Sequence, residues 1–368
     1  MKRKLKVLNI VGARPNMMKI APLISEMRRH KEIEALLLHT GQHYDRRMSK
    51  VFFEDLRIPK PDIYLGVGSG SHGEQTGRLM IRLEKAIADI KPDLVVVAGD
   101  VNSTMAAAIT ASKMGIPVAH IEAGLRSFDR TMPEEINRII TDSLSSYLFA
   151  PSLDAVRNLR REGHEDSDIF LVGNIMIDSL LQQRGRAAKS PILKRLKLDS
   201  KEYATLTLHR PSNVDDKNTL LKILAALNEL RKDIKIAFPM HLRTRKMIRR
   251  FELTGYLKRM KNVVVTPPLG YLDFLKLLCE SRFVLTDSGG IQEETTALGI
   301  PCVTLRHNTE RPLTITMGTN TLVGNDTGKI LAAARLILWG GSRPGRVPEF
   351  WDGKTSARIV KIIRGRLA

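Results

Sequence analysis

The 368-residue sequence has little cysteine and few aromatic residues, with two cysteines and aromatic side chains at 5% of positions. Cys279 and Cys302 stand in apolar segments, which suits a reducing cytoplasm and excludes a disulfide-based secreted scaffold. Paired Cys-x-x-Cys, His-Glu-x-x-His and Walker A motifs are missing, so the sequence predicts no metal site and no P-loop. The scarcity of aromatic rings also argues against a protein that stacks the bases of single strands.

Long apolar runs are also missing. No segment approaches the roughly 18–20 apolar residues that span a bilayer. The stretch VLNIV near the start is shorter than the apolar region of a signal peptide, and we expect it to be the first strand of the fold. We therefore expect a cytoplasmic protein without a membrane partner.

Positive charge is abundant, because 59 Lys and Arg face 39 Asp and Glu, a formal net charge of +20. Solvated surface charge is the first interpretation, a field that attracts an anionic ligand the second, and nucleic-acid binding the third. No helix-turn-helix, RNP or zinc-finger motif supports nucleic-acid binding. The basic residues are dispersed in short clusters: 2–4, 28–29, 160–161, 243–250, 258–261 and 364–366.

Short, β-branched apolar segments alternate with helix-length amphipathic segments along the whole chain. This alternation predicts an α/β fold with parallel sheets covered on both faces. The pattern restarts after residue 200, which predicts two α/β halves of ordinary domain size. The expected strands are residues 6–11, 34–40, 93–99, 117–122, 146–150 and 168–173 in the first half, and 204–210, 235–241, 262–268, 283–289 and 301–306 in the second.

Polar and ionisable residues directly follow most of these apolar segments. Ligands of open parallel sheets bind beyond the carboxyl ends of the strands, where such residues gather. A structural protein has no need of so many ionisable groups at one edge, so the pattern indicates an enzyme. The segments concerned are 12–19, 41–43, 99–104, 120–126, 209–213, 241–245, 287–294 and 306–311.

Two of these segments indicate anion binding. In VGARPNMMK, Arg14 and Lys19 stand where a helix begins after Gly12, and in LTDSGGIQEE a double glycine opens another helix after Ser288. Exposed backbone N–H groups and the helix dipole attract phosphate at such a position. The alternative in both cases is an ordinary turn with a helix cap.

Carboxylates and a histidine indicate acid–base chemistry. Asp100, Glu122 and Glu134 follow strands or open a helix, and His209 follows a strand of the second half. The alternative is structural: Asp100 as a cap, Glu134 as a partner of the helix dipole, and Glu122 in an ion pair with Arg126.

The segment 68–73 matches the Gly-x-Gly-x-x-Gly dinucleotide motif literally, but no convincing buried strand precedes it. Pro61 and Asp62 argue against such a strand, so we expect a loop. No tyrosine has a lysine four positions later, a pairing that sites of nicotinamide-dependent epimerases require. The sequence therefore predicts no nicotinamide cofactor.

Eight separated blocks, kept in order, resemble the non-hydrolysing UDP-N-acetylglucosamine 2-epimerases. The resemblance extends from residue 5 to about residue 325. It implies a glycosyltransferase-B-like fold: two Rossmann-like domains with a central cleft, residues 1–174 plus 351–368 and residues 175–350. The blocks are GARPNMMKIAPL, HTGQHYD, GDVNST, HIEAGLRS, MPEEINR, LHRPSNV, DSGGIQEE and RHNTERP…GTNTLVG.

The resemblance also implies roles for individual residues. UDP would lie mainly on the second domain, with its ribose hydroxyls on Glu294 and its uracil near Phe274. Asp100, Glu122 and Glu134, with Lys19 and His209, would be the catalytic residues. The substrate-binding residues would be Arg14, His241, Arg245, Phe274, Ser288, Gly289, Gly290, Glu294 and Arg311.

The implied reaction inverts C2 of the sugar through elimination of UDP, an enzyme-bound glycal and re-addition of UDP. The C2 hydrogen is not acidic, so the departing diphosphate and the cationic character at C1 need stabilisation. The implied partners are a UDP-sugar and a second copy of the chain in a homodimer, with no metal, nucleic acid or membrane. Some segments also resemble epimerases of 2,3-diacetamido-glucuronate nucleotides, so the decoration of the sugar stays open.

Two departures from the family concern its allosteric substrate site. Gln42 and His43 are kept, but Asp45 replaces a usual Gln, and Glu74 precedes Gln75 where Arg is common. We expect weak or absent activation by the substrate, seen as hyperbolic rather than sigmoidal initial rates.

Overall fold

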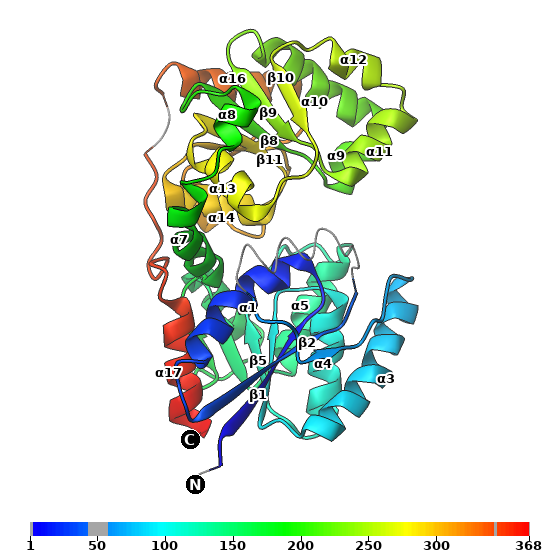
Figure 1. Ribbon diagram of the computed structural model, residues 1–368, viewed down its shortest axis with the longest axis vertical. Coiled ribbons are helices and arrows are strands. Elements are labelled where there is room, and N and C mark those ends of the chain that lie inside the picture. Colours follow the sequence, from blue (N-terminus) through cyan, green and yellow to red (C-terminus); the bar gives the residue numbers. More distant parts are fainter. Residues whose placement is uncertain (1–2, 43–57, 342–343, 368) are drawn as a thin grey trace. The chain divides into compact units, whose positions relative to one another are not determined.

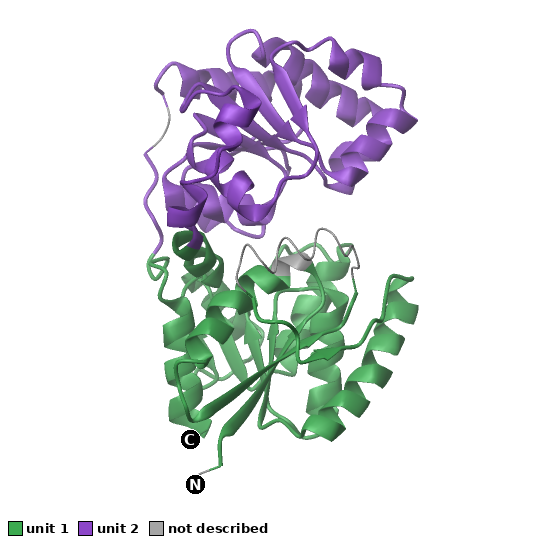
Figure 2. Ribbon diagram, viewed as in Figure 1, with its two compact units in different colours: residues 1–182, 349–368 green, residues 183–348 purple. Residues whose placement is uncertain are grey.

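The computed structural model describes residues 3–42, 58–341 and 344–367. The chain forms two compact units, which Figure 2 shows in different colours. Unit 1 consists of residues 1–182 and 349–368, and unit 2 of residues 183–348. The chain passes from one unit to the other inside helix α7 (Ile175–Ala187).

Unit 1 contains a parallel sheet with the strand order β3-β2-β1-β4-β5-β6-β7 (Figure 1). Strands that are buried on both faces read as continuous apolar runs, as in LVVVA of the fully buried β4. The strands are β1 (Leu5–Val11), β2 (Ile33–His39), β3 (Ile63–Tyr64), β4 (Leu94–Ala98), β5 (Val118–Ile121), β6 (Tyr147–Ala150) and β7 (Ile169–Leu171).

Helices alternate with these strands. Ser71 caps helix α3, since its hydroxyl accepts a hydrogen bond from the backbone N–H of Glu74. Helix α17 comes from the end of the chain and packs against α1. The helices are α1 (Arg14–Met27), α3 (His72–Ile90), α4 (Asn102–Lys113), α5 (Pro133–Ser143), α6 (Leu153–Arg161), α7 and α17 (Thr355–Leu367).

A buried carboxylate anchors α17 in unit 1. Asp178 of α7 accepts hydrogen bonds from the backbone N–H groups of Thr355 and Ser356, at 3.1 and 2.7 Å, and from the Ser356 hydroxyl. Burial raises the pKa of Asp178 more than these hydrogen bonds lower it. The side chain thus satisfies the free N–H groups at the start of α17.

Unit 2 contains a second parallel sheet with the strand order β10-β9-β8-β11-β12-β13. Its core is formed by aliphatic side chains of the strands and of α10 and α16. The strands are β8 (Tyr203–Thr207), β9 (Lys235–Pro239), β10 (Val263–Thr266), β11 (Phe283–Thr286), β12 (Cys302–Thr304) and β13 (Asn320–Leu322).

Two helices of unit 2 begin at aspartate N-caps. Asp216 caps α10 and Asp326 caps α16, each through a hydrogen bond from a backbone N–H three residues on. The helices are α8 (Ile192–Leu196), α9 (Pro211–Val214), α10 (Lys217–Leu230), α11 (Leu242–Arg250), α12 (Thr254–Lys258), α13 (Tyr271–Cys279), α14 (Gly289–Leu298), α15 (Leu313–Thr316) and α16 (Thr327–Leu338).

The predicted α/β class and the predicted strands are confirmed. The prediction missed the edge strands β3 and β13, which have two and three residues and carry little periodicity. Residues 68–71 form the expected loop, with Gly68 at φ +75°, whereas residues 72–73 already belong to α3. The helix-length amphipathic segment 46–55 lies outside the described residues. In the described part of the chain, every helix is too short or too polar to cross a membrane.

Candidate active site

The carboxyl edge of the unit 1 sheet holds a buried ion pair. Lys19 Nζ, on the second turn of α1, lies 2.5 Å from Glu122 Oε2, just beyond β5. Both side chains are at least nine-tenths buried, and no described residue hydrogen-bonds the second oxygen of Glu122. A buried acceptor without a partner is costly, so this oxygen is available to a ligand.

The backbone around this pair is unusual. Glu122 has φ +72°, a conformation that is strained for a residue with a side chain. Gly99, at the end of β4, has φ +71°, and a Cβ atom there would lie 2.7 Å from Lys19 Nζ. The strand ends therefore bring Lys19 and Glu122 together at a place where only glycine fits beside the ammonium.

A second ion pair occupies the same edge. Arg138 of α5 donates to Asp100 Oδ2 at 2.6 Å and to Glu135, so Asp100 has one oriented oxygen and is about one-third exposed. Glu135 is buried and accepts hydrogen bonds from the backbone N–H groups of Ser127 and Phe128. Glu134, the predicted residue of this helix start, is exposed to solvent.

Behind these carboxylates lies His120, which is fully buried. Its Nε2 donates to the carbonyl of Gly99 at 2.9 Å, and its Nδ1 lies 2.6 Å from Asp142 Oδ1. Asp142 also pairs with Arg126. Burial would raise the pKa of Asp142, but the charges of His120 and Arg126 lower it overall. Arg126 thus pairs with Asp142, and also with Glu162, rather than with Glu122 as in the structural alternative.

At the carboxyl edge of the unit 2 sheet, Asp287 orients His209. The buried Asp287 accepts hydrogen bonds from the backbone N–H groups of His209 and Arg210, at 2.9 and 2.8 Å. Its second oxygen lies 2.8 Å from His209 Nδ1. Burial would raise the pKa of Asp287, but His209 and these N–H groups lower it. The His209 ring therefore presents Nε2 outward, with 40% of the side chain exposed.

The same edge holds the start of α14, with Ser288 at the N-cap. A Cβ on Gly289 would lie 2.6 Å from Arg311 Nη1, so glycine lets this guanidinium approach the helix terminus. Arg311 itself is held by Glu293 at 2.9 Å and Glu310 at 2.6 Å. The free N–H groups of α14 and the Arg311 charge together suit a phosphate group.

Buried carboxylates of two kinds lie behind this helix terminus. Burial would raise the pKa of Glu310, but Arg311, Arg306 and Arg210 lower it strongly. Glu294 has no such cation, and burial together with the charge of Glu293 raises its pKa to about 8. Glu310 thus serves as a counter-ion, whereas Glu294 is a carboxyl group that a ligand with hydroxyls can engage.

The remaining predicted residues occupy different places. His241 caps α11, and its ring centroid lies 5.6 Å from that of His209. Phe274 is half-buried on α13, and Gly290 follows Gly289 in α14. Arg245 lines a separate hollow with α12 and β10. The backbone of Arg14 begins α1, and its side chain lies outside the described residues, as do His43 and Asp45.

Gln42 and Gln75, which belong to the predicted regulatory loops, are buried. Gln42 Oε1 accepts a hydrogen bond from the backbone N–H of Ser103, and Gln75 Oε1 accepts one from Asn102. Asn137 joins Asn102 to the carbonyl of Asp100. These amides therefore connect the regulatory loops to the loop of Asp100.

Sequence reasoning missed Asp142, Asp287, Glu310 and Arg138, which hold the predicted residues in place. All but Asp142 lie within the sequence blocks that resemble the family, and this location could have identified them. No group of three or more His, Cys, Asp or Glu side chains in the described ranges is arranged to hold a metal ion.

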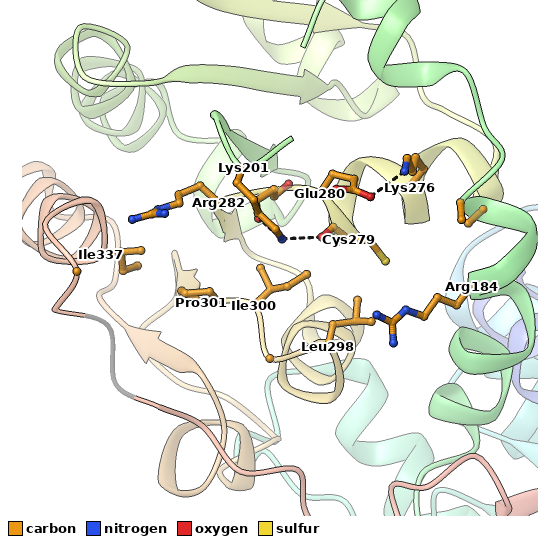
Figure 3. Close-up of a pocket in the computed structure, with 15 residues that line it drawn as sticks. Arg184, Lys201, Lys276, Cys279, Glu280, Arg282, Leu298, Ile300, Pro301 and Ile337 are labelled. Carbon is orange, nitrogen blue, oxygen red and sulfur yellow. Dashed lines mark hydrogen bonds and ion pairs between the residues drawn. The ribbon is translucent and has the colours of Figure 1, made fainter. Parts of the chain in front are cut away.

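A hollow of about 680 Å³ lies elsewhere in unit 2, at the amino ends of the strands (Figure 3). Two of its cations serve local structure: Lys201 donates to the carbonyls of Cys279, the last residue of α13, and of Ser281, and Lys276 pairs with Glu280. Cations are favourable at helix C-termini. This hollow is therefore separate from the carboxyl edge that holds the candidate site.

Comparison with known proteins gives one consistent family. The UDP-N-acetylglucosamine 2-epimerase family model matches residues 25–364. UDP-N-acetylglucosamine 2-epimerase of Methanocaldococcus jannaschii is 46% identical over 98% of this chain and 99% of its own length. UDP-2,3-diacetamido-2,3-dideoxy-D-glucuronate 2-epimerase of Pseudomonas aeruginosa is 43% identical over 98% of this chain and 99% of its own length.

A solved structure gives the same result. The M. jannaschii UDP-GlcNAc 2-epimerase in complex with UDP-GlcNAc and UDP matches with a TM-score of 0.91 and 45% identity, over 98% of this chain and 99% of that one. The two parallel sheets with alternating helices thus form a glycosyltransferase-B-like α/β fold. The chain belongs to the UDP-N-acetylglucosamine 2-epimerase family.

Proposed function

We propose that this protein is a non-hydrolysing UDP-N-acetylglucosamine 2-epimerase, which interconverts UDP-N-acetylglucosamine and UDP-N-acetylmannosamine. The observation that carries the proposal is the pairing of buried Lys19 with Glu122 in a chain 46% identical to an enzyme of that name. The glycine-opened terminus of α14 beside Arg311 supports a diphosphate ligand.

Unit 2 holds UDP in this proposal. The N–H groups of Gly289 and Gly290, the Ser288 hydroxyl and Arg311 bind the diphosphate, assisted by Arg14, His241 and Arg245. Glu294 forms hydrogen bonds with the ribose hydroxyls, and Phe274 lies against the uracil. His209, oriented by Asp287, stabilises the diphosphate as it leaves.

Unit 1 supplies the groups that remove and return the proton at C2 of the sugar. A carboxylate removes the C2 proton while the C1–O bond breaks, the electron pair leaves with UDP, and a C1–C2 double bond forms. UDP then adds back at C1 as a proton is delivered to the opposite face of C2. Asp100, Glu122 and Glu134 supply the acid and the base, and Lys19 pairs with Glu122 in its buried position. No nicotinamide or metal takes part in this scheme.

Proton NMR of UDP-N-acetylglucosamine in D₂O tests the reaction directly. We expect the manno isomer to appear with deuterium at C2, without any added nicotinamide, and turnover to be strongly reduced with Glu122→Gln. A substrate that stays unchanged and fully protonated would reject the assignment.

A second candidate is the 2-epimerase of UDP-2,3-diacetamido-2,3-dideoxyglucuronate, because a relative of that name is 43% identical over nearly the whole chain. Competition between the two nucleotide sugars in the same NMR assay separates the candidates. The higher kcat/KM identifies the substrate.

The proposal places the enzyme in the cytoplasm, as a homodimer that supplies polysaccharide biosynthesis. Ile81 on α3 is 71% exposed, which leaves this side chain accessible to a second copy. Analytical ultracentrifugation tests this, with Ile81→Glu expected to shift the protein towards the monomer. A wild-type protein that sediments as a monomer would reject the dimer.

A further inference from the structure

Unit 2 contains a groove of about 410 Å³, and of its lining residues only Arg245 belongs to the proposed epimerase site. Residues of α11, α12 and the edge strand β10, which are labelled in Figure 1, line it. Its floor is aliphatic and includes Met240, Ile248, Leu257 and Val265, of which Val265 is 40% exposed. All of its lining residues are described, and none is aromatic or acidic.

Positive charge surrounds this floor. Residues 241–261 contain one carboxylate, Glu252, and eight cations, so about a third of the net charge of the chain falls within 21 residues. Four of the cations line the groove itself. The eight are Arg243, Arg245, Lys246, Arg249, Arg250, Lys258, Arg259 and Lys261.

Local structure does not account for this charge. Arg243 pairs with Asp215, but none of the four cations that line the groove forms an ion pair with any described carboxylate. The helix dipole favours Arg249 in the last turn of α11 and opposes Arg243 and Arg245 in the first. Like charges four residues apart, as in Arg245 and Arg249, further weaken the helix.

The composition of the groove indicates an anionic amphiphile. Cations on the rim bind a phosphate group, and an aliphatic floor accommodates a hydrocarbon chain. A nucleic acid is disfavoured because the groove offers no aromatic ring on which a base can stack. Clusters of four to eight Lys and Arg are typical of surfaces that bind anionic lipids.

We propose that the α11–α12 groove binds anionic phospholipid and holds the enzyme at the surface of a membrane. This inference goes beyond the epimerase function and reverses the sequence-based expectation of no membrane partner. No part of the chain needs to cross the bilayer, because the contact consists of headgroup charge pairing and a shallow apolar contact. For the cations of residues 241–261, and only for these, lipid binding replaces the interpretation as solvated surface charge.

Cosedimentation with vesicles tests the proposal. We expect the protein to sediment with vesicles of equal phosphatidylglycerol and phosphatidylcholine, to stay in solution with phosphatidylcholine alone, and to be released by salt. The triple variant Arg249→Glu, Lys258→Glu and Lys261→Glu should bind at least about tenfold more weakly. Val265→Ser, which leaves the charge unchanged, should weaken binding a few-fold.

A matched control changes the net charge of unit 2 equally at exposed sites elsewhere: Lys189→Glu, Lys194→Glu and Lys222→Glu. This control should bind vesicles like the wild type, and both triple variants should keep wild-type epimerase turnover without vesicles.

Equal loss of vesicle binding in both triple variants, or no sedimentation with anionic vesicles, would overturn the proposal. An RNA could also displace the protein fully from vesicles. If it did so equally well with the Val265→Ser variant, the groove would be a site for polyanions in general, and the proposal would be overturned. Failure here leaves turnover intact, so it is distinguishable from failure of the epimerase assignment.

Discussion

The carboxyl edges of the two sheets carry opposite chemistry on the same fold. In unit 1, two carboxylates at the edge each pair with a cation: Glu122 with Lys19, and Asp100 with Arg138, which also pairs with Glu135. In unit 2 the order is reversed. Glu310 and Glu293 are buried and hold Arg311 beside the glycine-opened terminus of α14.

The difference shows how loops, and not the sheets, divide the work between the units. Unit 1 presents oxygens that can take or give a proton, and unit 2 presents N–H groups and a guanidinium that attract phosphate. Since both sheets are parallel and similarly covered, the sign of charge at each edge comes only from the residues after each strand. Substitutions at the two edges should therefore affect different kinetic quantities.

The largest effect is expected in unit 1. Glu122→Gln, Asp100→Asn and Glu134→Gln should each reduce kcat by about 10²–10⁴-fold, because each removes a group that takes part in proton transfer. UDP affinity, measured by calorimetry, should stay close to that of the wild type. Glu162→Gln is the matched control, since Glu162 pairs with Arg126 away from the edge and should leave kcat nearly unchanged. Near-normal turnover in all three variants would remove unit 1 from the chemistry.

The sequence was sufficient to predict which residues lie at the carboxyl edges of the sheets. It was insufficient to predict which of these residues pair with one another. Buried runs such as LVVVA predict parallel strands, and the residues after them must lie at the carboxyl edge, so Glu122 and His209 were found. Lys19 and Glu122 are 103 positions apart, and His209 and Asp287 are 78 apart. Only packing decides such partners. For the same reason, sequence spacing wrongly suggested Arg126 as the structural partner of Glu122.

In unit 2, Arg311→Lys should reduce UDP affinity by up to about a hundredfold and change kcat less than Glu122→Gln does. A lysine keeps the charge but cannot span Glu293 and Glu310 with a planar fork, so the cation leaves its place beside Gly289. Calorimetric titration with UDP measures the loss. Arg335→Lys, which alters an exposed pair with Asp233, should bind UDP normally. An equal loss of affinity in the two variants would contradict a specific phosphate contact.

Glu294 should make stability depend on pH. Its pKa of about 8 in the folded state lies above the ordinary 4.5, so between these values the folded chain keeps a proton that the unfolded chain has lost. The free energy of unfolding should therefore fall as pH rises, by about 2 kcal/mol between pH 6 and pH 7.5 for one proton. Denaturant titration of wild type and Glu294→Gln measures this difference. A variant with the same pH slope as the wild type would reject the buried neutral carboxyl.

The smallest effect sharpens the comparison within unit 2, between its two edges. Lys201 lies at the amino edge and donates to the backbone carbonyls of Cys279, the last residue of α13, and of Ser281 (Figure 3). Lys201→Met should lower stability by about 1 kcal/mol in denaturant titration, because it leaves those carbonyls to solvent, and it should not change UDP affinity or turnover. Lys235→Met, which removes a longer contact to the carbonyl of Lys197, is a control with a smaller loss. If Lys201→Met impaired turnover instead, cations at the amino edge would act on the substrate. Charged residues that act in the reaction could then no longer be told from structural ones by whether they lie at the carboxyl ends of the strands.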